Sequence, residues 1–142
     1  MQLTGDMLTV NEIFSGLTTP ASAAHIHCCG PAGVNEPVAV PFTLFPNSTS
    51  GTYGSVFDLA LASTDNSIFL TANGGTAASA ESALIAGLSS LQAYANIHDS
   101  TFPGGEIRGQ LQPVPEPTSV GLFLVGLVSA IAQVRKRGRA DA

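Results

Sequence analysis

Apolar and polar side chains alternate in several short runs of this chain, and a period of two is typical of half-buried β-strands. In the first run Leu8, Val10 and Phe14 share one face, with Glu12 as a charged mismatch in phase with them. Glycine and proline residues, which favour turns, separate the runs, and Pro41 interrupts one of them. We predict strands in six runs: 8–14, the histidine segment that begins at Ala23, 37–45, 53–61, 93–99 and 105–112.

A different period occurs between residues 77 and 92. Ala80, Leu84, Leu88 and Leu91 recur at near-helical spacing, and Thr76 is a suitable N-cap. This segment therefore predicts one short helix. Short strands joined by glycine and proline turns, with a single helix among them, predict an all-β antiparallel sandwich.

Residues 118–134 form an uncharged, apolar segment that follows a proline-rich stretch. A helix of about seventeen residues spans about 25 Å, slightly less than the roughly 30 Å hydrocarbon core of a bilayer. We predict a C-terminal transmembrane helix rather than a buried core helix, because apolar residues occupy every face of the segment. The basic residues that follow it, among them Arg135, Lys136 and Arg137, would stay in the cytoplasm and leave the body of the chain outside it.

The body of the chain is acidic. Residues 1–117 contain nine acidic residues against one basic residue, Arg108, which gives a formal net charge of −8. Nucleic-acid binding needs clustered lysine and arginine, so this composition excludes nucleic acid as an expected partner.

The three histidines lie in two distant segments. His25 and His27 are two positions apart on a predicted strand, so their imidazoles share one face, and His98 can join them if the two strands pair. Imidazole nitrogens suit zinc and copper, so these residues form a candidate metal site. The alternative is structural, with the histidines forming hydrogen bonds between strands and fixing the register.

Cys28 and Cys29 follow directly and are further candidate metal ligands. Neighbouring Cα atoms lie about 3.8 Å apart across a trans peptide, which is less than the roughly 4.4 to 6.8 Å of ordinary disulfides. A bond between the two cysteines would then be strained. Ligation by thiolates and pairing with another chain remain as alternatives.

The segment from Thr101 to Gly105 predicts a tight turn that contains Gly104 and Gly105. Glu106 and Arg108 share one face of the following strand and predict a structural ion pair beside this turn. No serine, cysteine or paired carboxylate is visibly arranged with a histidine for nucleophilic catalysis, so we do not expect an enzyme.

The C-terminus resembles the PEP-CTERM sorting signal of exopolysaccharide-producing Gram-negative bacteria. The signal consists of Val114, Pro115, Glu116 and Pro117, then the apolar helix, then the basic cluster. The resemblance implies recognition by an exosortase, cleavage near the proline motif and only transient anchoring in the inner membrane. It divides the chain into a body (1–112), a linker with the motif (113–117), a transmembrane helix (118–134) and a cytoplasmic tail (135–142).

The body resembles the CHRD domain, a β-rich module of bacterial exported proteins. The resemblance rests on the segments 14–17, 24–27, 94–98 and 103–110, which follow one another in the order of the family. It implies an immunoglobulin-like antiparallel Greek-key sandwich without an assigned activity. The cysteine pair departs from the glycine that is more usual after the histidines.

The first residues lack the basic and apolar regions of a signal peptide, and family domains usually have a further upstream strand. We therefore expect Met1 to be an internal start, with a leader and a strand encoded before it.

These observations predict an exported, non-enzymatic module at the cell surface or in the exopolysaccharide matrix, where it binds polysaccharide or surface proteins. The alternative function is a copper- or zinc-binding sandwich, with or without redox activity.

Overall fold

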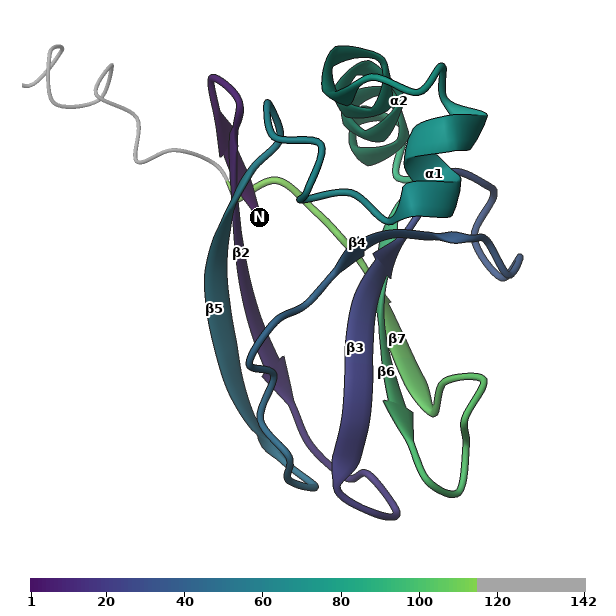
Figure 1. Cartoon of the computed structure of the whole chain (residues 1–142). Helices are drawn as coiled ribbons and strands as arrows, with labels where there is room; N and C mark the ends of the chain where they lie inside the picture. Colours follow the sequence, from purple (N-terminus) through teal and green to yellow (C-terminus); the bar gives the residue numbers. More distant parts are fainter. Residues whose placement is uncertain (115–142) are drawn as a thin grey trace, which may run out of the picture.

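Two antiparallel sheets pack face to face in the computed structural model, which describes residues 1–114 (Figure 1). The first sheet has the order β1 (Gln2–Thr4), β2 (Met7–Phe14) and β5 (Gly51–Asp58). The second has the order β4 (Val38–Pro41), β3 (Ala21–His27), β6 (Tyr94–Asp99) and β7 (Ile107–Gln110). The predicted antiparallel, mostly β architecture is therefore confirmed.

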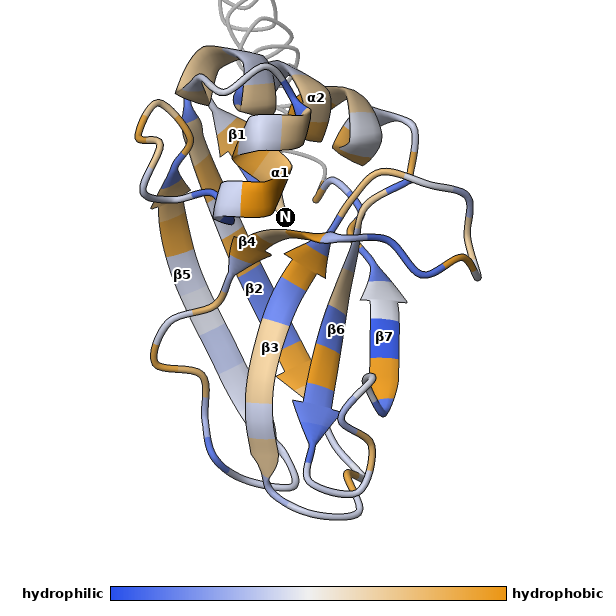
Figure 2. Ribbon diagram, turned by 45° about the vertical axis from the view of Figure 1, so that its right-hand side comes forward, coloured by the Kyte–Doolittle hydropathy of each residue, from blue (hydrophilic) through white to orange (hydrophobic). Residues whose placement is uncertain are grey.

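The core lies between the sheets and follows the predicted alternation. Leu8 and Val10 of β2 and Ile26 of β3 are completely buried, whereas the residues on either side of Ile26 point to the outer face. Figure 2 shows this alternation of apolar and polar residues along the strands. Burial of each large aliphatic side chain contributes roughly 1.5–3 kcal/mol, which favours this register over one shifted by a single residue.

Glu12 is an exception to the apolar inner face, as its place in the pattern predicts. Glu12 lies on β2 and lines a pocket that residues of β7 also line. Its Oε1 atom has no hydrogen-bond partner among the described residues. Burial raises the pKa of Glu12 to about 7. The carboxyl group is therefore partly protonated at neutral pH.

The predicted helix is present as α2 (Ala77–Ser89), with Thr76 as its N-cap and a capping box formed with Ser79. Leu84 and Leu88 are its largest buried residues and pack against the core. A second helix, α1 (Ser67–Ala72), was not predicted, because six residues are too few to show a helical period. Both helices lie at one end of the sandwich (Figure 1).

Several strand boundaries differ from those predicted. β4 ends at Pro41 instead of continuing to residue 45, and β5 begins at Gly51 and ends at Asp58. β7 covers only residues 107–110 of the predicted run 105–112, and β1 was not predicted. Short edge strands carry little periodic signal, since few side chains alternate along them.

The predicted transmembrane helix 118–134, the tail 135–142 and residues 115–117 of the motif lie outside the described residues. No helix within residues 1–114 is long and apolar enough to cross a bilayer.

Candidate metal centre

The three histidines meet on the outer face of the second sheet. β3 and β6 pair antiparallel with Ala23 opposite His98 and His25 opposite Asn96, so alternate residues of both strands share this face. The next pair in the register is His27 opposite Tyr94. The expected strand pairing thus brings together segments that are about seventy residues apart in the sequence.

One ring nitrogen from each histidine lies within 4.8 Å of one from each of the other two. The closest contact is 3.2 Å, between Nδ1 of His25 and Nε2 of His98. Three nitrogens at this spacing can reach a common ion, because zinc–nitrogen bonds are about 2.0–2.1 Å long.

Backbone carbonyls fix which nitrogen carries the proton in two of the rings. Nδ1 of His27 lies 2.6 Å from the carbonyl oxygen of Glu36, and Nδ1 of His98 lies 2.9 Å from that of Pro103. A carbonyl oxygen only accepts, so both Nδ1 atoms donate and both Nε2 atoms keep a lone pair. Metal-binding histidines typically have such a partner on the nitrogen that faces away from the metal.

Nε2 of His27 is buried and has no hydrogen-bond partner among the described residues. Only 8% of the His27 side chain is exposed, so water has little access to that lone pair. A buried acceptor without a partner costs about 1–3 kcal/mol. A bound cation would satisfy it.

The electrostatic environment favours neutral rings. Burial, followed by the nearby charges of His98 and His27, lowers the pKa of His25 to about 4. Burial also lowers the pKa of His27, although the hydrogen bond to Glu36 opposes this effect. Both rings are therefore neutral at pH 7, and neutral imidazole is the form that binds metals.

Aromatic packing supports His27 from one side. The Tyr94 ring stacks on it with centroids 5.1 Å apart, and the Tyr94 hydroxyl accepts the backbone N–H of Glu36 at 3.0 Å. The guanidinium of Arg108 lies 4.9 Å from the Tyr94 centroid and donates to Asn35 Oδ1 at 2.7 Å. Sequence reasoning did not predict this role of Tyr94, although its spacing of four from His98 placed it on the same strand face.

Comparison with known families identifies the domain. The CHRD domain matches residues 1–111. The chain belongs to the CHRD family. No curated protein and no solved structure matches the chain.

In this CHRD domain the predicted ion pair between Glu106 and Arg108 is replaced by other contacts. Both carboxylate oxygens of Glu106 accept the backbone N–H of Thr18 at 3.0 Å, and Oε1 also accepts its hydroxyl at 2.7 Å. Arg108 instead binds the loop beside the histidines, at Asn35. The two residues are close in the sequence, but Glu106 has its partner in the segment before β3 and Arg108 has its partner in the segment after β3.

The segment from Thr101 to Gly105 forms a turn that positions the carbonyl group of Pro103. The N–H of Phe102 donates to Asp99 Oδ1 at 2.6 Å, and the N–H of Gly105 donates to the carbonyl of Phe102 at 2.9 Å. Gly105 has a φ of 106°, and any Cβ atom there would overlap the side chain of Asn96. Only glycine fits this position, next to the carbonyl that orients His98.

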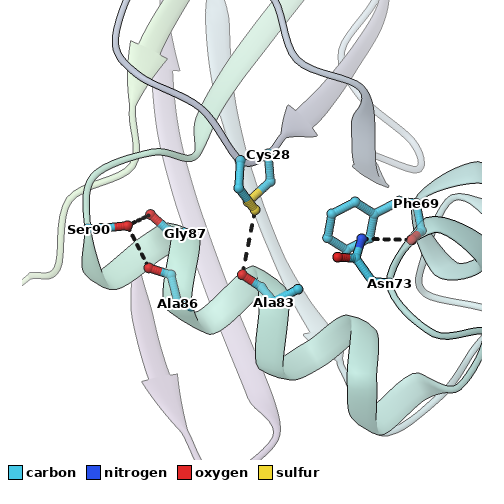
Figure 3. The surroundings of a disulfide bond; sticks show 8 residues. Cys28, Phe69, Asn73, Ala83, Ala86, Gly87 and Ser90 are labelled. Carbon is cyan, nitrogen blue, oxygen red and sulfur yellow. Dashed lines mark hydrogen bonds between the residues drawn. A yellow bond between two sulfur atoms is a disulfide. The ribbon is translucent and has the colours of Figure 1, made fainter.

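Cys28 and Cys29 form a disulfide with each other, instead of pairing with another chain or remaining free to ligate a metal. The Cα separation expected from the sequence assumed a trans peptide, whereas the peptide bond between them is cis and their Cα atoms are 3.1 Å apart. Figure 3 shows the sulfurs beside α2, where Cys29 Sγ lies 3.5 Å from the carbonyl oxygen of Ala83. The backbone of α2 passes so close at Gly87 that a Cβ there would overlap both sulfurs. The cysteines therefore lie outside the histidine cluster and offer no free thiolate to it.

Proposed function

We propose that this CHRD domain is a non-enzymatic, exported module that binds one copper or zinc ion through His25, His27 and His98. The observation that carries the proposal is the convergence of three imidazoles around the buried, unpartnered Nε2 atom of His27. The carbonyl groups of Glu36 and Pro103 support it, because they orient two rings for ligation before any metal arrives. The resemblance to exported family members favours an immunoglobulin-like Greek-key topology for the two sheets.

The register-fixing alternative explains only part of this arrangement. The 3.2 Å contact between His25 and His98 fits a hydrogen bond between neighbouring strands. It does not explain why His27 keeps a buried lone pair without a partner, since a purely structural residue would gain stability from satisfying it. A metal ion accounts for all three rings.

Three histidine ligands leave one position of a tetrahedral zinc or copper site for another group. Water can fill that position, as can a donor from polysaccharide or a surface protein. The domain would in this way link metal binding to the surface or matrix role that the resemblance to a C-terminal sorting signal implies.

Metal loading of the purified chain tests this function. After exposure to copper or zinc and removal of excess metal at pH 7, we expect about one ion per chain by elemental analysis. His25→Ala should lower this content well below one, whereas Thr52→Ala, at an exposed position of β5 in the other sheet, should leave it unchanged. Substoichiometric metal after loading with both ions, without any change in His25→Ala, would remove the proposal.

We further propose that an exosortase recognises Pro115, Glu116 and Pro117 and that the apolar helix anchors the precursor transiently in the inner membrane. The three-part order of motif, apolar segment and basic cluster supports this proposal. The chain, fused to an export leader and expressed in an exosortase-containing bacterium, should be cleaved and reach the surface or the medium. Replacing the three motif residues with alanine should leave uncleaved chain in the inner membrane; equal processing of both forms would contradict exosortase sorting.

A further inference from the structure

One side of the sandwich is open, between β2 of the first sheet and β7 of the second. A cavity of about 320 Å³ lies there, lined by residues 11–14 and 107–112 and by inner-face residues of β6. Its base is apolar, because Phe14, Ile97 and Leu111 belong to the buried core. We call this cavity the open edge pocket; its volume is at the lower end of the roughly 300–1,000 Å³ of ligand pockets.

β2 has an unpaired edge beside this pocket. β5 pairs with β2 along its whole length, from Met7 to Phe14, but on the other side β1 pairs only with residues 7–9. Residues 10–14 therefore have no strand on that side within the part of the chain that the structure describes. An edge strand with free N–H and C=O groups is a template for pairing with another extended chain.

The direction of the backbone groups along β2 shows which of them are free. The N–H of Leu59 donates to the carbonyl oxygen of Asp6 at 2.8 Å, so Asp6 and every second residue after it face β5. The N–H and C=O groups of Asn11 and Ile13 consequently face the open edge. Two residues at this spacing can each exchange a pair of hydrogen bonds with an added antiparallel strand.

Glu12 lies between these two residues, and alternation along β2 places its side chain on the inner face. Its Oε1 atom is buried and has no hydrogen-bond partner among the described residues. The terminal ammonium group of Met1 is near enough to act on the carboxyl, but it donates to the carbonyl oxygen of Gln112. Arg108 also lines the pocket, yet its guanidinium donates to Asn35. The buried oxygen of Glu12 therefore lacks a donor.

We propose that the open edge pocket binds an extended segment of another protein, which adds a strand to β2 and places a lysine or arginine opposite Glu12. The added backbone would pair with Asn11 and Ile13, as in other complexes formed by strand addition. The residue opposite Glu12 would form a non-hydrogen-bonded pair with it, in which facing side chains are closest. Its cationic group would supply the missing donor, and apolar residues two positions away would cover the base of the pocket.

Charge complementarity favours such a basic partner segment. Residues 1–117 contain nine acidic residues against one basic residue, so the domain attracts positively charged chains. A second copy of this chain suits the edge less well. Antiparallel pairing of two β2 edges about residue 12 would place two Glu12 carboxyl groups opposite each other, and like charges in that position are destabilising.

Amide hydrogen exchange of the whole chain, followed by NMR, tests the added strand. The probe is the peptide acetyl-Thr-Val-Thr-Lys-Thr-Val-Thr-amide, whose valines and lysine share one face. Without peptide, the N–H groups of Asn11 and Ile13 should exchange faster than those of Val10 and Glu12, which face β5. Saturating peptide should slow the exchange of Asn11 and Ile13 at least about tenfold. Protection of both groups before peptide is added would place this chain or a second copy at the edge, and would overturn the proposal.

Ile13→Pro and Ile13→Ala form a matched pair of variants. Proline removes an N–H that faces the open edge, a position where strands tolerate it, and should abolish peptide binding. Alanine keeps that N–H and should bind the peptide as the wild type does. Glu12→Gln, which leaves the backbone unchanged, should weaken binding at least about tenfold by calorimetry, as should glutamate in place of the peptide's lysine. A wild type that does not bind the peptide, or equal affinities in all variants, would contradict strand addition at this edge.

Discussion

Replacing His27 with alanine is expected to weaken copper or zinc binding by more than about 100-fold, which exceeds the typical loss on removing a supporting residue of a metal ligand. His27 is the most buried of the three imidazoles, and its unpartnered Nε2 atom is available only to a group inside the cluster. Its loss would leave two ligands on neighbouring strands, too few for a stable site. Competition titration against a chelator of known affinity measures the change.

Tyr94→Phe provides the graded comparison for this prediction. The change keeps the ring that stacks on His27 but removes the hydroxyl that accepts the N–H of Glu36, whose carbonyl orients His27. We expect a loss of about 10-fold, the lower end of the range for supporting residues. Unaltered affinity in His27→Ala would show that the ion binds elsewhere, even if the other variants behave as expected.

Ile26→Ala is expected to lower the free energy of unfolding by about 2–5 kcal/mol, the largest stability effect we predict for a single substitution. Ile26 is fully buried between the sheets, near the C-terminal end of β3, and its neighbours in sequence are two of the proposed ligands. Deleting three methyl or methylene groups there removes buried apolar surface and leaves a cavity between close-packed sheets. Urea denaturation followed by circular dichroism measures the difference.

Ile13→Ala is the matched control, since Ile13 also lies on a strand but is 86% exposed. Its effect should stay within about 0.5 kcal/mol. Equal losses in the two variants would mean that the core does not lie where the alternation of β3 places it. The folded fraction of Ile26→Ala should still bind metal, because the ligands sit on the opposite face of the strand.

The expected loss of metal affinity at His27 and the expected loss of stability at Ile26 both follow from the position of β3. β3 lies in the interior of its sheet, with β4 and β6 on either side, so its inner face contributes to the core and its outer face carries two histidines. A site on such a strand is held rigidly by the core beneath it. The loops that contain Glu36 and Pro103 then only need to orient the rings.

Several features of the fold followed from the sequence because they depend on neighbouring residues. The period of two placed His25 and His27 together on the face opposite Ile26, and helical spacing with a threonine cap predicted α2. The charged mismatch at Glu12 was also visible in the pattern, and burial in the structure raises its pKa to about 7.

Other features could not be predicted because they depend on residues far apart in the chain. Glu106 and Arg108 have Thr18 and Asn35 as partners, and the Cys28–Cys29 disulfide lies against α2. Helix α1 is too short for a period, and Asp65 carries no local sign that it will be buried without a partner.

The sequence by itself determined the class of this protein: a mostly β domain of the CHRD family with two histidines on one strand face. Only the tertiary structure decided that His98 reaches them, that carbonyls of two loops fix the ring protons, and that the cysteines face the helix instead. The physical reason is that alternation along a strand is local. Strand register and loop position, by contrast, result from packing over the whole sandwich. This packing determines which distant residues each side chain contacts.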